Sequence, residues 1–449
     1  MQKKPSINAR EIALLTLVEC ERDEVKSEQA LHRYLNKYKP ARNDSALATE
    51  LVNGILRFRQ SIDSIITAFY HHKLKKASPF LVNILRIGVY QLRYLDRIPD
   101  WAAVSQCVDL ARKYKGQHIA RIVNGVLRSV AANPQKTVSS LEMQNPLQQL
   151  AAATSHPEWM LERWMARYGE DRTRRVTSYN NTPPLFGLRI NTLKTNKEAM
   201  LKAFADASVE FIETGLPSFL LTKDFHRTEP FITLGLLTVQ NPVQALPCLL
   251  LDPEEGETVL DMCAAPGGKS TFLAELMHNS GKVIAVDRYP NKCRTIRERA
   301  SQMAISVITT IDSDARNVPA GITPAKILLD APCSGTGVLA RRPELRWKMN
   351  REKITQLVAL QESLLNHAAT LLPAGGVLVY STCSIEEEEN MLQIDRFLQK
   401  HPEFIAESHP RGLPGPCHEL SGHPGAYLTL PGDHEGFDGG FAQRLRKQA

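Results

Sequence analysis

The stretch Asp261–Thr271, which reads Asp-Met-Cys-Ala-Ala-Pro-Gly-Gly-Lys-Ser-Thr, decides the expected fold of the carboxyl-terminal half of the chain. An apolar run from residue 258 enters it and a helical pattern over 270–277 leaves it, which predicts a strand, a tight turn and a helix. Gly267 and Gly268 let the backbone of this turn approach a ligand closely. The ending Gly-Lys-Ser also occurs in the phosphate-binding loop of NTPases, but that loop requires a glycine at position 263, where this chain has cysteine. An NTP phosphate site is therefore not expected here.

Strand-like and helix-like patterns alternate along the chain after residue 258. The expected strands cover 258–263, 282–287, 306–311, 325–330 and 376–380. Such alternation is typical of a mostly parallel sheet with helices on both faces. Four of these strands run into short polar segments that carry an aspartate, a cysteine or both. Because open α/β sheets bind ligands at the carboxyl ends of their strands, we expect the functional site at that edge.

Two aspartates near strand ends indicate the kind of cofactor. Asp287 ends the second strand about twenty residues beyond the glycine turn, where a carboxylate can accept hydrogen bonds from ribose hydroxyls. Asp314 follows the third strand and is expected beside the base of a bound nucleoside. Either carboxylate can instead cap a helix, so both interpretations stay open. Because the turn lacks the Gly-x-Gly-x-x-Gly pattern, S-adenosylmethionine fits it better than NAD.

The length of 449 residues predicts two or three domains, since a single hydrophobic core stops growing well below that size. Residues 1–132 have apolar positions at helix spacing and predict an all-α bundle, and the polar stretch 133–149 predicts a linker. Residues 150–237 predict a small α+β subdomain, and residues 238–449 predict the α/β domain. Five arginines of the subdomain are candidates for phosphate contact, although a solvated helix face has the same appearance: Arg163, Arg167, Arg172, Arg174 and Arg175.

The net charge of +7 is concentrated toward the amino terminus. Residues 1–130 contain 22 Lys and Arg against 12 Asp and Glu. This imbalance indicates a polyanion such as nucleic acid as a partner, although a solvated basic surface gives the same count. The sequence has no apolar run long enough to span a membrane and no secretory leader, so we expect a cytoplasmic protein without a membrane partner.

The eight cysteines stand singly, without a Cys-x-x-Cys pair, so no metal site is expected. In a cytoplasmic chain they are expected to be reduced thiols. Cys333 in Asp-Ala-Pro-Cys and Cys383 in Ser-Thr-Cys-Ser each follow an expected strand at the ligand edge. Free cysteines are often small core residues, but polar turn residues flank both of these, which favours a nucleophilic role.

Three motifs resemble those of the RNA cytosine-5 methyltransferase (NOL1/NOP2/Sun) family and occur in the same order: Asp261–Lys269, Leu328–Gly337 and Tyr380–Ser384. Near the amino terminus, 81–94, 98–104 and 123–128 resemble the NusB-like RNA-binding domain. Together these features resemble the bacterial branch of the family that methylates 16S ribosomal RNA. The resemblance implies an all-α NusB-like bundle, a small α+β RNA-binding subdomain and a Rossmann-like class I methyltransferase domain with a mostly parallel, seven-stranded sheet.

The resemblance also implies a role for each residue of the expected site. Cys383 would attack C6 of a cytosine, and Cys333 would act as the base that allows product release. Asp330 would hold the target base and help protonate its N3. Lys269 would approach the cofactor carboxylate or the cysteines, although a surface lysine at the start of a helix has the same appearance. DNA cytosine methyltransferases use a Pro-Cys nucleophile instead, so the division of roles between the two cysteines stays open. The residues implied to bind S-adenosylmethionine are Cys263, Ala264, Ala265, Pro266, Gly267, Gly268, Lys269, Asp287, Asp314 and Asp330.

The substrate implied by the resemblance is 16S ribosomal RNA before the 30S subunit is fully assembled, and the implied enzyme is a monomer. Two alternatives remain. The first is a cytosine-5 methyltransferase that acts on tRNA or DNA. The second is a non-catalytic RNA-binding protein of transcription or ribosome assembly, in which the methyltransferase fold is only a platform.

Three further features accompany the resemblance. Arg341, Arg342, Arg346 and Trp347 follow the second motif and are expected to guide a flipped nucleotide and its phosphates. The chain has Asn241 where the family more often has an acidic residue, so the contact made by that acidic group is open. Residues 435–445 resemble the closing strand of the family and are expected to pair at the sheet edge.

Overall fold

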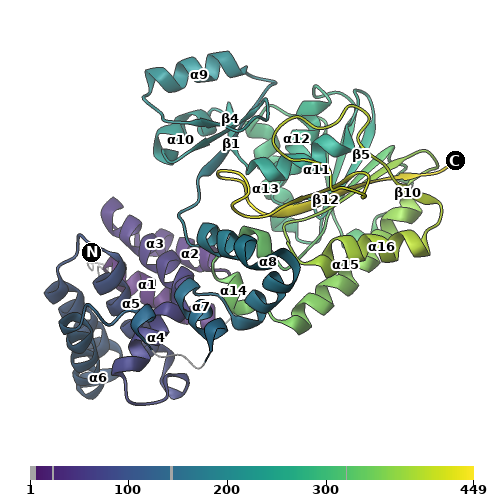
Figure 1. Cartoon of the computed structure of the whole chain (residues 1–449). Coiled ribbons are helices and arrows are strands. Elements are labelled where there is room, and N and C mark those ends of the chain that lie inside the picture. The colour runs from purple at the N-terminus through teal and green to yellow at the C-terminus, as the bar shows by residue number, and fades with distance from the viewer. Residues whose placement is uncertain (1–6, 23–24, 142–144, 320) are drawn as a thin grey trace. The chain divides into compact units, whose positions relative to one another are not determined.

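The computed structural model describes residues 7–22, 25–141, 145–319 and 321–449, which belong to two compact units. The helical unit comprises the chain up to Thr182 together with Arg342–Lys348. The sheet unit comprises Pro183–Arg341 and Met349–Ala449. Figure 1 shows that the first unit consists of helices and that the second contains the β-sheets.

The helical unit is an all-α bundle, as the sequence predicts. Its helices are α1 (Ala9–Arg22), α2 (Ser27–Tyr38), α3 (Arg42–Arg57), α4 (Arg59–Phe69), α5 (Pro79–Tyr94), α6 (Asp100–Ala132), α7 (Pro146–Thr154), α8 (Glu158–Asn180) and α14 (Leu345–Lys348), with 3₁₀ turns η1 (Leu74–Lys76) and η2 (Val138–Ser140). Ser78 and Asn145 cap α5 and α7, and each is followed by a proline at the first helical position. Apolar residues of α1, α3, α4, α5 and α6 form the core.

The unit boundary differs from the predicted domain boundaries. The predicted linker, 133–149, contains η2 and the start of α7, and the boundary lies after Thr182 rather than near residue 150. The reason is packing: Ser61 of α4 donates a hydrogen bond to the carbonyl oxygen of Ala152 (2.6 Å), which ties α7 to the bundle. The element α8 is interrupted at Gly169, whose φ of 77° is not helical.

The sheet unit begins with a small antiparallel sheet of order β2-β3-β1-β4. Its elements are β1 (Phe186–Ile190), α9 (Lys197–Asp206), β2 (Ile212–Glu213), β3 (Phe219–Thr222), α10 (Phe225–Thr233) and β4 (Leu237–Val239). Apolar side chains of β1, β3 and β4 pack with those of α9. This is the predicted small α+β arrangement.

The large sheet has the strand path β10-β12-β9-β8-β5-β6-β7, with β11 paired to β12. Its strands are β5 (Thr258–Met262), β6 (Lys282–Asp287), β7 (Ile308–Asp312), β8 (Lys326–Asp330), β9 (Val377–Thr382), β10 (Phe404–Ala406), β11 (Ala426–Thr429) and β12 (Gly440–Lys447). Five neighbouring strands are mutually parallel, in the order β9, β8, β5, β6 and β7. Strand β12 runs antiparallel to β9. The sheet therefore has eight strands, one more than the seven predicted. The chain order reverses between β5 and β8, which is where such sheets bind ligands.

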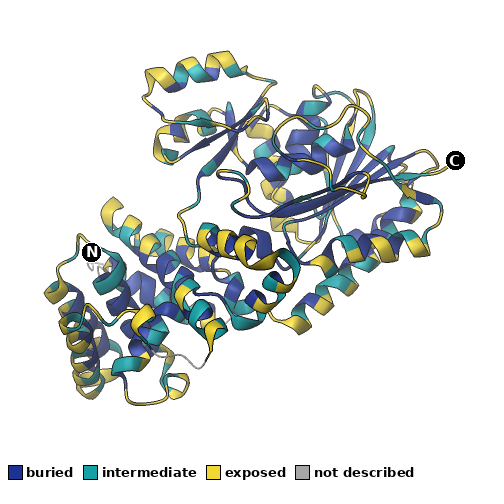
Figure 2. Ribbon diagram, viewed as in Figure 1, coloured by how far each residue is buried: buried dark blue, intermediate teal, exposed yellow. Residues whose placement is uncertain are grey.

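Helices cover both faces of this sheet, and the central strands β5, β6, β8 and β9 are mostly buried between them (Figure 2). Alternate residues of one strand face opposite ways: Val259 packs with α11 (Leu246–Leu251), α12 (Gly268–Leu276) and α13 (Pro290–Gln302), whereas Leu260 packs with α15 (Arg351–Leu371) and α16 (Met391–Lys400). The 3₁₀ turns of this unit are η3 (Pro242–Ala245), η4 (Ala315–Asn317), η5 (Thr336–Val338) and η6 (Glu387–Glu389).

The closing strand is not at the sheet edge, contrary to the prediction. Residues 440–447 form β12, which pairs with β9 on one side and with β10 and β11 on the other. The extra strands cover what would otherwise be an exposed edge of unpaired backbone groups.

Candidate active site

The glycine turn connects β5 to α12 as the sequence predicts. Cys263 has a φ of 62° and Gly267 a φ of 93°, and a Cβ atom on Gly267 would lie 3.2 Å from side-chain atoms of Ile296. Gly267 is therefore required by both its backbone conformation and its close packing on α13. The amide of Ala264 donates to the carbonyl oxygen of Val286 (2.9 Å), which ties the turn to β6.

A buried ion pair fixes the helix that follows the turn. Arg189 of β1 and Glu275 of α12 are 2.8 Å apart, and their side chains are 0% and 1% exposed. The same guanidinium donates to the carbonyl oxygen of Gly268 (2.7 Å) and to Thr271. The small sheet thus holds α12 in place beside the turn.

Two of the predicted cofactor carboxylates lie at the ends of β6 and β7. Asp287 is buried and accepts hydrogen bonds from the amides of Ala265 (3.3 Å) and Tyr289 (3.2 Å). Asp314 accepts from the amide of Arg316 and is also paired with its guanidinium at 2.7 Å, and the hydrogen bond of that side chain lowers the pKa of Asp314 to about 2. Asp314 therefore caps η4, which was the alternative that the sequence left open.

Asp330 and Lys269 form an ion pair at the carboxyl end of β8. The Lys269 Nζ to Asp330 Oδ2 distance is 2.7 Å, and Ser381 of β9 donates to Asp330 Oδ1 at 2.9 Å. Burial by itself would lower the pKa of Lys269, but the charge and the hydrogen bond of Asp330 raise it. Lys269 is thus held as an ammonium group at the sheet edge.

The two predicted cysteines meet at this edge. Cys333 lies three residues after β8, Cys383 directly follows β9, and their sulfur atoms are 3.2 Å apart. The hydrogen bond with Cys383, followed by burial, raises the pKa of Cys333 well above the ordinary value. A pocket opens beside them, and its lining includes Lys269, Asp330, Ser381, Cys383 and Asp438.

A buried glutamate that the sequence analysis missed holds both cysteine loops. Glu389 accepts hydrogen bonds from the amide of Ser334 (2.9 Å), from the hydroxyls of Ser334 and Ser384, and from Gln361 (2.9 Å). Ser334 follows Cys333 and Ser384 follows Cys383, so one carboxylate fixes the positions of both thiols. Residues 386–389 are four consecutive glutamates, a run that is typical of a solvated charged segment. Glu386 and Glu389 are both buried, and Glu389 is distinguished by the hydrogen bonds that its carboxylate accepts from Ser334, Ser384 and Gln361.

Asn241 has a structural role that a carboxylate could not fill. Its amide nitrogen donates to the carbonyl oxygen of Gly436 (2.8 Å), while its oxygen accepts from the amides of Val243 (3.1 Å) and Asp438 (3.2 Å). An aspartate would lose the donated bond. The departure from the family pattern therefore keeps residues 436–438 beside the pocket.

The prediction that Arg346 guides a nucleotide is wrong, because its side chain is buried in the helical unit. The same role for Arg341 and Trp347 stays a prediction. Arg346 is 0% exposed, and its Nη1 and Nη2 groups donate to backbone carbonyl oxygens of the helical unit. The Trp347 indole donates to the carbonyl oxygen of Leu56 (2.7 Å). Arg341 is paired with Asp438 at 2.6 Å. Arg342 is exposed.

Comparison with known proteins identifies the family. A family model described as 16S rRNA methyltransferase RsmB/F matches residues 248–446, a NusB family model matches 7–132, and an RsmF/B-like ferredoxin-like domain model matches 156–221. The chain is 34% identical, over 99% of its length, to the whole of a probable ribosomal RNA small subunit methyltransferase B from Bacillus subtilis. The chain belongs to the RsmB/F methyltransferase family.

Other RsmB/F relatives agree. A ribosomal RNA small subunit methyltransferase B from Pasteurella multocida is 32% identical over 90% of this chain and 88% of that protein. The solved structure of PH0851 superposes with a TM-score of 0.82 at 28% identity, covering 99% of this chain and 100% of that one. The predicted family, the NusB-like bundle and the methyltransferase domain are thereby confirmed. Within the described ranges, no helix is long and apolar enough to cross a membrane, and no three His, Cys, Asp or Glu side chains are grouped as metal ligands.

Proposed function

We propose that this chain transfers a methyl group from S-adenosylmethionine to C5 of a cytosine in 16S ribosomal RNA, through a covalent bond between Cys383 and C6 of the base. The observation that carries the proposal is the 3.2 Å approach of the Cys333 and Cys383 sulfur atoms at the ends of two adjacent parallel strands. The names of the relatives from Bacillus subtilis and Pasteurella multocida support small-subunit ribosomal RNA as the substrate.

The residues around the glycine turn fit S-adenosylmethionine, which would supply an electrophilic methyl group. Gly267 and Gly268 place no side chain between the backbone of the turn and a ligand, and Asp287 keeps acceptor capacity beyond its two amide bonds for ribose hydroxyls. In the proposal the backbone of residues 263–269 faces the cofactor, with Asp287, Asp314 and Asp330 around it.

The reaction needs a covalent step because cytosine C5 is too weak a nucleophile to take a methyl group directly. Addition of the Cys383 thiolate to C6 moves an electron pair to C5, while a proton is placed on N3. S-adenosylmethionine, held by residues 263–269 and Asp287, would supply the methyl group to C5, with its neutral thioether as the leaving group. The Cys333 thiolate would take the C5 proton, the electron pair of that C–H bond would form the C5–C6 double bond as the Cys383 thiolate leaves C6, and N3 would return its proton, which restores the aromatic ring. Asp330 is held by Lys269 and Ser381, and it would orient the base and help to protonate its N3.

The environment of the two thiols supports Cys383 as the nucleophile. Cys383 lines the pocket, and Cys333, whose pKa is raised by its hydrogen bond with Cys383, remains protonated and can donate its S–H to the Cys383 thiolate. When Cys383 is bonded to C6, that hydrogen bond and the repulsion from the Cys383 thiolate are removed. The pKa of Cys333 then falls, so Cys333 loses its proton more readily and a larger fraction of it is the thiolate that can take the C5 proton.

The test is a methyl-transfer assay with radiolabelled S-adenosylmethionine on deproteinised 16S ribosomal RNA, intact 30S subunits and tRNA. We expect label in 5-methylcytosine of the ribosomal RNA for the wild type and for the control Cys20→Ala, since Cys20 lies in α1 of the helical unit. Cys383→Ala should abolish transfer, and Cys333→Ala should accumulate a protein–RNA adduct that survives denaturation. Label in tRNA alone would contradict the substrate, and absence of transfer to any RNA would favour the non-catalytic platform.

A further inference from the structure

Residues 342–348 lie between β8 and β9 in the sequence but fold as part of the helical unit. The chain leaves the sheet unit after Arg341, forms α14, and returns to the sheet unit at Met349. Only eight residues separate Cys333 from Arg342, the first residue of this segment. The helical unit is therefore built from two separate pieces of chain.

Arg346 completes the carboxyl ends of three helices in that unit. Its guanidinium donates to the carbonyl oxygens of Arg57 (2.9 Å), Ser155 (3.1 Å) and Asn180 (2.6 Å), and to the side-chain oxygen of Asn181 (2.8 Å). Arg57 is the last residue of α3, Ser155 caps α7, and Asn180 is the last residue of α8. Such terminal carbonyl groups have no donor inside their own helix and carry the negative end of the helix dipole. One buried cation therefore satisfies three helix ends at once.

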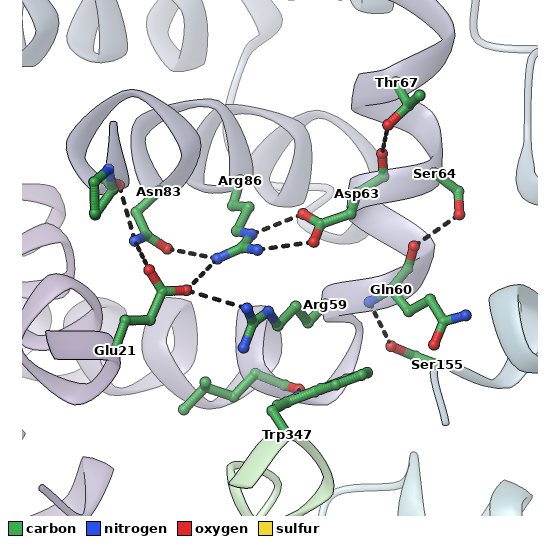
Figure 3. Close-up of polar contacts among 12 residues, drawn as sticks. Glu21, Arg59, Gln60, Asp63, Ser64, Thr67, Asn83, Arg86, Ser155 and Trp347 are labelled. Carbon is green, nitrogen blue, oxygen red and sulfur yellow. Dashed lines mark hydrogen bonds and ion pairs between the residues drawn. The ribbon is translucent and has the colours of Figure 1, made fainter. Parts of the chain in front are cut away.

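The neighbours of Arg346 extend this attachment into the bundle. Trp347 donates to the carbonyl oxygen of Leu56, and its ring lies 5.5 Å from the Arg59 guanidinium. Figure 3 shows the Trp347 ring beside Arg59 and the network that continues through Glu21 and Arg86 to Asp63 and Asn83. Lys348 donates to the carbonyl oxygen of Val25 (2.6 Å). Three consecutive side chains of the segment are thus committed to the helical unit.

Two residues just before this segment, Gly337 and Arg341, are held by hydrogen bonds within the sheet unit. The amide of Gly337 donates to the carbonyl oxygen of Cys383 (3.0 Å), and Arg341 is bound to Asp438 (2.6 Å) and to the carbonyl oxygen of Leu185 (2.7 Å). Only five residue steps separate the two arginine anchors, a length that cannot exceed about 17 Å even when fully extended. Without the Arg346 contacts, Arg341 would be the last of these side-chain anchors before the chain returns at Met349.

We propose that Arg346 is a positioning residue for RNA methylation, which locks residues 342–348 into the helical unit and thereby steadies the loop that carries Cys333. The inference rests on the proposed function, in which Cys333 serves product release. It assigns a catalytic consequence to a side chain that touches neither the cofactor nor the base.

The test uses the full-length chain with Arg346→Met, which removes the cation, and with Trp347→Phe, which removes only the indole donor and serves if the first variant folds poorly. Hydrogen exchange of the intact protein, followed by peptide mass spectrometry, should rise about tenfold or more both at the ends of α3, α7 and α8 and within residues 331–341. Arg342→Met, which alters an exposed arginine of the same segment, is the exchange control and should behave as the wild type.

Kinetics at a temperature where every variant is folded separate positioning from stability. All four tryptophans lie in the helical unit, so their fluorescence reports whether that unit is intact. Arg346→Met should lower kcat for RNA methylation roughly fivefold or more, leave the affinity for S-adenosylmethionine unchanged, and prolong the lifetime of the protein–RNA adduct. Faster exchange confined to the helix ends, with kcat unchanged, would overturn the proposal. If the wild type methylates no RNA, the proposed function fails, while exchange within 331–341 still decides whether the anchor steadies the loop.

Discussion

Replacing Asp261 by asparagine should change how the stability of the sheet unit depends on pH. Asp261 lies in β5, is 0% exposed, and accepts a hydrogen bond from Ser270 (2.5 Å). Burial raises the pKa of this carboxyl to about 7 from its usual 3.8, although the hydrogen bond from Ser270 acts in the opposite direction. The folded protein therefore holds a proton on Asp261 that the unfolded chain has already lost at neutral pH.

The sign and size of the effect follow from linkage. Because the folded pKa is raised, the stabilising contribution of the neutral acid is fully present below the unfolded pKa and is lost as the pH rises to about 7. A shift of about three units corresponds to roughly 4 kcal/mol. Asparagine cannot ionise, so the stability of Asp261→Asn relative to the wild type should rise by about this amount between pH 3.5 and pH 8.

The assay needs a reporter in the sheet unit, since the tryptophans report only on the other unit. Cys248 is fully buried, and its sulfur lies 3.7 Å from the carbonyl oxygen of Lys269, close to the helix that follows the turn. Urea equilibration at each pH, followed by a brief thiol-labelling pulse at one fixed pH, measures unfolding at this position. Asp206→Asn, at an exposed position of α9, is the control and should follow the wild type. Parallel pH curves for Asp261→Asn and the wild type would refute the reasoning.

Three further substitutions test the site. Gly267→Ala places a Cβ at a φ of 93° against Ile296, so it should cost about 1–2 kcal/mol of stability and weaken S-adenosylmethionine binding measured by calorimetry. Arg189→Met leaves Glu275 buried without its partner and should destabilise the sheet unit by roughly 3–5 kcal/mol in the same thiol-labelling assay. Glu389→Gln replaces one acceptor oxygen of the group that binds Ser334 and Ser384, and bonds to a charged acceptor contribute about 1.5–3 kcal/mol each. Because these serines follow the two cysteines, this variant should lower kcat with little change in cofactor affinity. These expectations would be contradicted if Gly267→Ala bound the cofactor as the wild type does, if Arg189→Met were as stable as the wild type, or if Glu389→Gln kept the wild-type kcat.

Local patterns predicted the strands well because each buried strand carries its own apolar signal. The predicted 258–263, 282–287 and 325–330 differ from β5, β6 and β8 by no more than one residue at either end. The meeting of Cys333 and Cys383 also followed from sequence, since the carboxyl ends of parallel strands share one edge.

What the sequence did not predict depends on contacts between distant segments. Arg346 donates to backbone carbonyl oxygens at the ends of α3, α7 and α8. Every residue has such a carbonyl group, so the sequence of these helices does not indicate that an arginine binds there. Glu389 stands in an acidic run, and its burial is set by Ser334 and Gln361, which lie 55 and 28 residues away in the sequence.

Covalent catalysis by Cys383 is tested most directly by trapping the intermediate. An RNA substrate in which cytidine is replaced by 5-fluorocytidine can accept the thiolate and the methyl group, but it has no proton at C5 to lose, so the enzyme should remain bonded to C6. After incubation with S-adenosylmethionine and digestion of both protein and RNA, mass spectrometry identifies the modified residue. We expect the methylated fluoro-dihydrocytidine on Cys383, whereas the adduct on Cys333, or methylation without any adduct, would contradict the account.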